Sequence, residues 1–239
     1  MHSQKKMTVK HRIGVVVAEE IELEPMAPFL SECGAKSHEW FQHRGYTFIL
    51  EDTEVYIAVS GVGKVNAATA ATDLIHRGCE ILLNFGMSGG ISQVKRGDLV
   101  LVSGCAEHDF DLSVIGYKPF EKPSQISVFQ ADKKLNEIAL SVLPYVKCGM
   151  AVSGDSFICS NEKREQLKEW FGAFSCDMES AAIASVAFMA SVPFAALRRI
   201  SDDSGDDAIT EHRAMNNATE TDLTGSFLLW LKEIIRSFL

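Results

Sequence analysis

Two acidic residues, Glu179 and Asp202, are the strongest candidates for chemistry in this chain. Each follows an apolar run that predicts a buried strand, residues 172–176 and 192–200, and the apolar run between them, 180–189, predicts a helix. Two strands joined by a buried helix indicate a βαβ unit with parallel strands, and ligands bind at the carboxyl ends of such strands. A helix-terminal acid or a turn residue would explain either one alone, but together they favour a shared site.

Four glutamates follow another apolar run, residues 13–17, which predicts a first buried strand. They are Glu19, Glu20, Glu22 and Glu24. Acids in the first turn of a helix are stabilised by its dipole, so a solvated helix start explains some of them. Four acids within six residues exceed what a helix terminus needs, and we expect one of them to face the same site.

Two glycine-rich segments also follow predicted strands. Gly61-Val62-Gly63 precedes an alanine-rich helix predicted for residues 65–77. Such a turn can bind an anion, although a tight turn is the commoner reason for it, and the sequence lacks a phosphate-binding P-loop pattern. Residues 86–90 follow an apolar strand and let the backbone approach a ligand closely.

The pattern of histidines and cysteines does not favour a metal site. His108 precedes Asp109 and Asp111, which suggests metal binding or acid–base chemistry, but no second histidine lies at ligand spacing. We therefore predict a structural or subunit-contact role for His108. The six cysteines form no CxxC pair, and we interpret them as reduced core residues of a cytoplasmic protein.

The composition predicts a single α/β domain over residues 1–239, because 46% of the residues are hydrophobic. Residues 38–60 predict antiparallel strands, and a helix is predicted over most of residues 211–239. The polar start lacks the apolar centre of a signal peptide, and we expect residues 1–11 to be a disordered extension. A net charge of -9 argues against nucleic-acid binding, and no apolar run is long enough to span a membrane.

Taken in order, the motifs resemble the nucleoside phosphorylase and nucleosidase superfamily, and most of all its 5'-methylthioadenosine/S-adenosylhomocysteine nucleosidases. The resemblance extends from Ile13 to the C-terminal helix. The motifs that carry it are Ile13-Gly14, Ser60 to Val65, Gly86 to Gly90, Gly97-Asp98, His108-Asp109, Val152 to Asp155, Asp177 to Glu179 and Arg198 to Asp202.

This resemblance implies a mixed central β-sheet flanked by helices, in a protein that forms a homodimer. It implies a cytoplasmic hydrolase of methionine salvage. Such an enzyme cleaves the N-glycosidic bond of 5'-substituted adenosines and releases adenine and a ribose derivative, without a metal or an organic cofactor. In the helix at 65–77, Ala67, Ala68, Ala70 and Ala71 would permit the close approach of a second copy.

The resemblance also assigns roles to particular residues. Asp202 is implied to protonate N7 of adenine as the bond breaks, and Ser201 to orient it. Glu22 is implied to be the base that activates water, with Arg198 beside that water. This division fits the reaction, because the leaving purine gains negative charge and the ribose gains positive charge.

Other residues are implied to bind the nucleoside. Glu179 would bind the ribose hydroxyls and Met178 would pack against the sugar. Phe157 would stack on adenine, and the backbone of Ile158 would hydrogen-bond it. Further substrate contacts are implied for Ala18 and Met87, and for Ile115 and Pro123 around the 5' group, the last two from a partner subunit.

Three positions bear on the alternatives that remain open. Asn84 and Met87 stand where relatives that use phosphate carry basic and hydroxyl residues, which favours water as the nucleophile. The nucleosidases usually have serine at the position of Met87 and methionine at that of Glu19. A purine nucleoside phosphorylase, a 6-amino-deoxyfutalosine-type nucleosidase and a non-catalytic nucleoside-binding protein are the alternatives.

Overall fold

The computed structural model describes residues 9–40, 43–215 and 221–238. Its strands are β1 (His11–Val17), β2 (Lys36–Trp40), β3 (His43–Leu50), β4 (Thr53–Val59), β5 (Ile81–Gly90), β6 (Leu99–Glu107), β7 (Val128–Gln130), β8 (Lys147–Ser153), β9 (Ser175–Asp177) and β10 (Phe194–Asp202). They form one mixed sheet in the order β10-β6-β8-β9-β5-β1-β4-β3-β2, with β7 beside β6. Because β10 also pairs with β5, five of the strands close into a ring.

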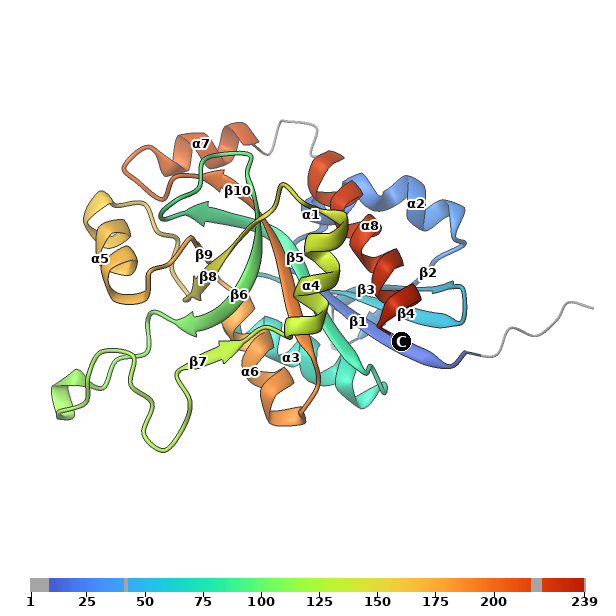
Figure 1. The fold of residues 1–239 in the computed structure, drawn as a ribbon, viewed down its shortest axis with the longest axis horizontal. Coiled ribbons are helices and arrows are strands. Elements are labelled where there is room, and N and C mark those ends of the chain that lie inside the picture. Colours follow the sequence, from blue (N-terminus) through green and yellow to red (C-terminus); the bar gives the residue numbers. More distant parts are fainter. Residues whose placement is uncertain (1–8, 41–42, 216–220, 239) are drawn as a thin grey trace, which may run out of the picture.

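Helices cover both faces of the sheet (Figure 1). They are α1 (Glu20–Leu23), η1 (Glu24–Met26), α2 (Ala27–Glu32), α3 (Lys64–His76), η2 (Ser113–Ile115), α4 (Lys133–Val142), α5 (Asn161–Phe171), α6 (Ser180–Ala190), α7 (Ala208–Met215) and α8 (Thr221–Ser237). The pair α4 and α8 packs together, as does the pair α3 and α6. Among the described residues, no helix has the length and hydropathy needed to cross a membrane.

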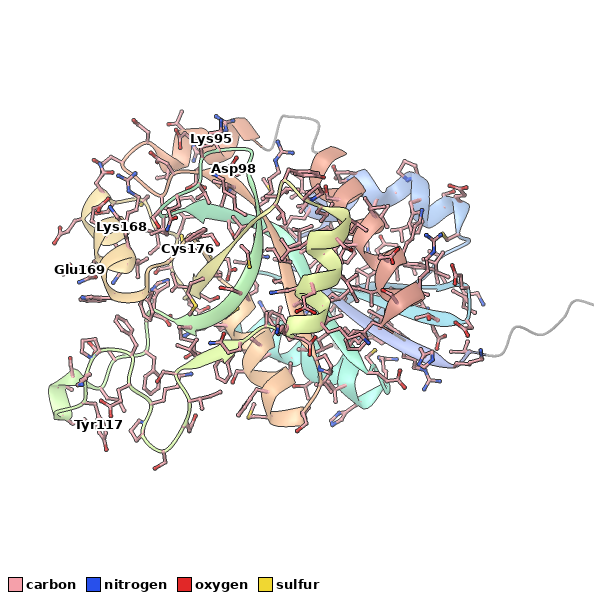
Figure 2. All side chains as sticks on the ribbon, in the orientation of Figure 1. Lys95, Asp98, Tyr117, Lys168, Glu169 and Cys176 are labelled. Carbon is pink, nitrogen blue, oxygen red and sulfur yellow. The ribbon has the colours of Figure 1, made fainter. Side chains whose placement is uncertain are left out.

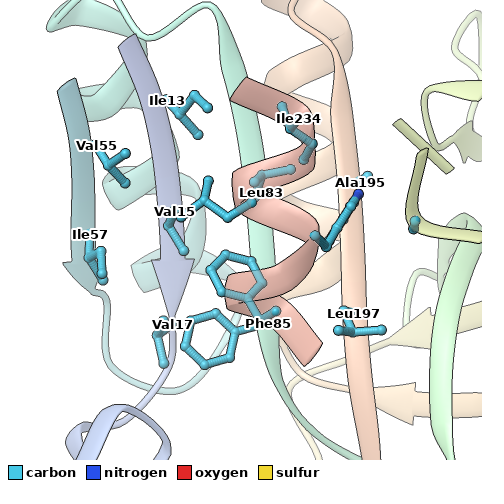
Figure 3. Close-up of a cluster of buried hydrophobic side chains, with 14 of the residues drawn as sticks. Ile13, Val15, Val17, Val55, Ile57, Leu83, Phe85, Ala195, Leu197 and Ile234 are labelled. Carbon is cyan, nitrogen blue, oxygen red and sulfur yellow. The ribbon is translucent and has the colours of Figure 1, made fainter. Parts of the chain in front are cut away.

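The strands at the centre of the sheet are apolar on both sides because each side meets a helix layer. Along β1, Val15 and Val17 belong to the core cluster that contains α8, whereas Val16 belongs to the cluster that contains α3 and α6. Figure 3 shows Val15 and Val17 beside Phe85 of β5, with Ile234 of α8 packed over the same face. The predicted α/β fold with a mixed sheet flanked by helices is confirmed.

Several predicted elements are present. The helices expected at 65–77 and 180–189 are α3 and α6, and the strands expected in residues 38–60 are the antiparallel β2, β3 and β4. The prediction of a disordered extension over residues 1–11 is wrong at its end, because His11 already pairs with Thr53 in β1. Residues 1–8 of that extension lie outside the described part.

The predicted βαβ unit with adjacent parallel strands is wrong. β5 lies between β9 and β10; it is parallel to β10 and antiparallel to β9. The reason is the length of β5, whose earlier residues pair with β10 and whose last two residues pair with β9. Gly89 opposes both Cys176 and Asp202, so the two acidic segments still meet at one place.

Three of the four alanines that were predicted to face a second copy lie inside this chain. Ala67, Ala70 and Ala71 are buried, where α3 packs against α6. Small residues at this contact let the two helices approach each other closely. For these three residues the prediction that they permit the approach of a partner subunit is wrong, whereas Ala68 is half-buried and its part of the prediction stays a prediction.

Candidate active site

A cavity of about 170 Å³ lies where the ends of β5, β9 and β10 meet. α1 and α7 and the segment after β8 complete its walls. The predicted site residues that line it are Ala18, Glu22, Met87, Phe157, Ile158, Met178, Glu179, Ser201 and Asp202. Segments far apart in the sequence thus bring three carboxylates to one cavity, as the two acidic runs and the glutamate cluster predicted.

Glu22 is the glutamate of the N-terminal cluster whose carboxylate is held at the cavity wall. Its Oε1 accepts a hydrogen bond from Met87 N at 2.7 Å, and its Oε2 accepts from Ala18 N at 3.1 Å and Glu19 N at 3.2 Å. Burial raises the pKa of Glu22 to about 7, against the opposing charge of Arg198. A carboxylate with this pKa can accept a proton near neutral pH.

Arg198 lies beneath the cavity rather than in its lining. It is fully buried on β10, where Nε donates to Ser88 Oγ at 3.0 Å and Nη2 donates to Glu179 Oε2 at 3.2 Å. Nη1 has no hydrogen-bond partner. It points toward Gly86 together with Glu22 Oε1, because a Cβ at Gly86 would lie 2.8 Å from Nη1 and 2.5 Å from Oε1.

The glycine turn before α3 binds a side chain of the protein itself. Gly63, at φ 100°, donates its backbone N–H to Glu179 Oε1 at 3.0 Å. Both Glu179 oxygens are therefore held, one by this turn and one by Arg198. Burial raises the pKa of Glu179 above its ordinary value, although Arg198 opposes the shift.

Asp177 forms an ion pair with Arg198. Ser153 Oγ donates to its Oδ1 at 2.6 Å, and its Oδ2 lies 3.0 Å from Arg198 Nη2. Burial by itself would raise the pKa of Asp177, but Arg198 and the serine hydroxyls hold the pKa below its ordinary value. Asp177 is thus the permanent counter-charge of Arg198, which leaves Glu179 less completely neutralised.

Asp202 also lines the cavity and is 1% exposed. Ser201 Oγ donates to its Oδ2 at 2.7 Å and Ser204 N donates to its Oδ1 at 2.9 Å. A Cβ at Gly89 would overlap Ser204 Oγ and would lie 3.0 Å from Asp202 Oδ1. The glycine at this position therefore makes room for Ser204 and for the carboxylate of Asp202.

Two of the predicted residues lie away from the cavity of this chain. Ile115 is 67% exposed, and neither it nor Pro123 lines the cavity. Both belong to the segment between β6 and β7, which extends from the body of the molecule (Figure 1). Figure 2 shows Tyr117 of this segment far from Cys176, which lines the cavity.

A profile of the phosphorylase superfamily matches residues 12–234. The chain belongs to the phosphorylase superfamily. Its similarity to a 5'-methylthioadenosine/S-adenosylhomocysteine nucleosidase of Staphylococcus aureus is 36% identity over 199 residues, which cover 80% of this chain and 86% of the relative. The resemblance inferred from the motifs is confirmed.

Solved structures of other phosphorylase-superfamily members agree with this fold. The S-adenosylhomocysteine nucleosidase of Streptococcus pyogenes, in complex with 5-methylthiotubericidin, is 27% identical with a TM-score of 0.85, covering 94% of this chain and 98% of that one. The futalosine hydrolase of Helicobacter pylori is 26% identical with a TM-score of 0.88, covering 93% and 98%.

The sequence alone did not single out every cavity residue of this superfamily member. Ser88 and Ser204 belong to segments that were recognised, but neither was assigned a role. His212 was overlooked, because the sequence places it inside a long predicted helix with no motif around it. In the structure it lies on α7, lines the cavity and has Nδ1 3.7 Å from Asp202 Oδ2.

Proposed function

We propose that this protein hydrolyses the N-glycosidic bond of 5'-substituted adenosines, 5'-methylthioadenosine and S-adenosylhomocysteine, and releases adenine and a ribose derivative. The observation that carries the proposal is that Glu22, Glu179 and Asp202 line one cavity, where we assign Glu22 as the base and Asp202 as the acid. The nucleosidase relative that covers most of the chain supports the same reaction.

In this proposal Asp202 protonates the leaving purine. Protonation of N7 turns adenine into a neutral leaving group, so the electrons of the breaking bond are accepted without a free anion. Ser201 donates to Oδ2 at 2.7 Å and Ser204 donates to Oδ1 at 2.9 Å, which fixes the plane of the carboxyl group. General acid catalysis of this kind contributes roughly 10²–10⁴-fold to a rate.

In this proposal Glu179 binds the ribose. Its oxygens are held by Gly63 N and Arg198, so the carboxylate is oriented before substrate binds. It accepts hydrogen bonds from the ribose hydroxyls and stabilises the positive charge that develops on the sugar. Met178 packs against the sugar. Phe157, which is 44% exposed, stacks on adenine, and the backbone of Ile158 hydrogen-bonds it.

In this proposal Glu22 activates the attacking water. A carboxylate whose pKa is about 7 takes the proton of the water as the C1'–O bond forms. Arg198 Nη1, which has no hydrogen-bond partner, points to the same place beside Gly86 and orients the water. Ala18 and Met87 line the wall on this side.

Water rather than phosphate is the nucleophile in this proposal. Asn84 is fully buried, with Nδ2 donating to Val16 O and Oδ1 accepting from Ser180 Oγ, so its amide is occupied. Met87 presents a thioether to the cavity where an anion would require a donor. The test is incubation with a panel of 5'-substituted adenosines, with and without excess phosphate. We expect free ribose sugar in both cases, and sugar 1-phosphate as the main product would refute the hydrolase.

A futalosine-type nucleoside is the second candidate substrate. The observation that favours it is the similarity to the Helicobacter pylori futalosine hydrolase, with a TM-score of 0.88. Both candidates share the adenine-directed acid and the ribose-directed carboxylate. Including 6-amino-deoxyfutalosine in the same panel separates them by kcat/KM.

We also propose a homodimer that works in methionine salvage in the cytoplasm. Val114 and Ile115 are 92% and 67% exposed on a segment that does not line its own cavity. In the dimer this segment, with Pro123, closes the 5' end of the partner's cavity. The six free cysteines suit a reducing compartment. Sedimentation as a monomer at micromolar concentration would contradict the dimer.

A further inference from the structure

We propose that His212 supplies Asp202 with its proton, connecting the buried acid to solvent. This inference rests on the proposed function, because it concerns the acid that protonates the leaving purine. His212 acts through Asp202, so it is a positioning residue for proton supply rather than a group that touches the reacting atoms.

The two side chains lie within ion-pair distance of each other. His212 Nδ1 lies 3.7 Å from Asp202 Oδ2, and it lies 3.3 Å from Ser201 Oγ, which itself donates to the same Oδ2. A proton can therefore pass from the imidazole to the carboxylate either when the ring closes the gap or through the serine hydroxyl. Ser201 Oγ is also 3.2 Å from Ser88 O, so its hydrogen has an alternative acceptor.

The two side chains differ in their access to water. The Asp202 side chain is 1% exposed, whereas that of His212 is 32% exposed. The groups that hydrogen-bond Asp202 are a serine hydroxyl and a backbone N–H, which do not exchange protons near neutral pH. Among protein side chains, the imidazole of histidine is the group that ordinarily takes up and releases a proton near neutral pH.

The position of the ring is fixed from two sides. Asp203 N, which directly follows the acid, donates to Glu211 Oε2 at 3.0 Å and ties the first turns of α7 to the end of β10. On its other side the imidazole meets the ring of Phe157 nearly edge-on, with centroids 5.5 Å apart. His212 thus stays beside Asp202 while one edge of the ring remains open to water.

The proton balance of the reaction creates the need for such a residue. In each turnover Asp202 loses its proton to N7 and Glu22 gains one from water. The site returns to its starting state only when Glu22 releases a proton and Asp202 regains one. In the proposed step the N–H bond of the imidazolium breaks, the O–H bond of Asp202 forms, and the neutral imidazole takes its next proton from solvent.

Other titratable groups around the cavity are less suited to this task. Glu19 and Glu22 line it from the start of α1, and Asp177 and Glu179 line it from the end of β9 and the turn after it; no ion pair or hydrogen bond joins any of these four residues to Asp202. Cys176 lines it too, but burial raises the pKa of its thiol to about 12. His212 alone combines contact with Asp202 and access to water among the described residues.

The test compares His212→Gln, His212→Phe and His212→Ala with the wild type, using the exposed His76→Gln on α3 as the matched control. Phenylalanine keeps the ring packing on Phe157, and glutamine keeps a hydrogen-bonding group. Neither side chain can take up and release a proton near neutral pH. In dilute buffer we expect all three His212 variants to lose about 10-fold or more in kcat while KM changes little.

Imidazole in solution supplies the decisive measurement. In His212→Ala we expect added imidazole to restore much of the lost kcat in proportion to its protonated form, with no effect on His76→Gln. Thermal midpoints confirm that the variants are folded. Full activity of His212→Gln and His212→Phe in dilute buffer, or a loss in His212→Ala that no concentration of imidazole relieves, would overturn the proposal. Absence of adenine release by the wild type would instead refute the proposed function.

Discussion

Replacing Glu22 by glutamine should make the protein less active and, at alkaline pH, more stable. Its carboxyl has a pKa of about 7 in the fold against an ordinary value of 4.5. Because the folded value is the higher one, the fold is favoured by protonation of this group, and its contribution is fully present below pH 4.5. That stability is lost as pH rises from 4.5 through about 7.

The size of the effect follows from these two values. For one group with them, the cost to the wild-type fold is about 0.8 kcal/mol at pH 5 and about 3.3 kcal/mol at pH 8. Glu22→Gln cannot ionise and escapes this cost. The free energy of unfolding of the variant, relative to wild type, should therefore rise by about 2.5 kcal/mol between pH 5 and pH 8.

Urea unfolding of both proteins at the two pH values measures this difference. Glu24→Gln, an exposed glutamate two residues further on, is the matched control and should show little pH-dependent difference. In parallel, the kcat/KM of the wild type should fall about 10-fold per pH unit below pH 7, because the base is then protonated. A stability difference that does not change with pH, together with an acid limb centred near pH 4.5, would refute the assignment of a raised pKa.

Three further substitutions test other parts of the site and the core. Asp202→Asn should lower kcat by about 10²-fold or more while adenine still binds. A nucleoside with a better leaving group should restore the kcat of Asp202→Asn but not that of Glu22→Gln. Equal recovery in both variants would show that the roles are wrongly assigned. Gly86→Ala places a methyl group 2.5 Å from Glu22 Oε1, so we expect a 10-fold or greater loss of kcat/KM, and normal kinetics would contradict that geometry. Trp230→Phe removes the indole donor to Leu135 O and leaves a void, which should cost about 1–3 kcal/mol in urea unfolding; an unchanged midpoint would show that the contact is neutral.

Local patterns in the sequence were enough to predict the elements that carry their own periodicity. The apolar run at 180–189 is α6, and the alternation in residues 38–60 gives the antiparallel strands β2 to β4. Glu179 and Asp202 were likewise found from their positions after strands, whereas Glu22 was chosen among four glutamates only through the family resemblance. Glu22, Glu179 and Asp202 line one cavity, and the segments that carry the last two meet because Gly89 of β5 opposes both Cys176 and Asp202.

Features that depend on distant pairing could not be predicted in the same way. That β5 lies between β9 and β10 is a property of long-range partners, which leave no local signal. The helix expected over most of residues 211–239 is two helices, with α7 ending at Met215 and α8 beginning at Thr221. His212 lies beside Asp202 because α7 packs against β10. The residues around His212 in the sequence do not indicate this neighbour.

The hold on Glu22 has a consequence for how this site can change over time. Its donors are the backbone N–H groups of Met87, Ala18 and Glu19, and a backbone donor does not depend on the side chain attached to it. Other side chains at Met87 and Glu19 would therefore reshape the wall of the cavity and leave the backbone hydrogen bonds to Glu22 in place. We expect substitutions at these two positions to alter the choice of substrate more than the position of Glu22.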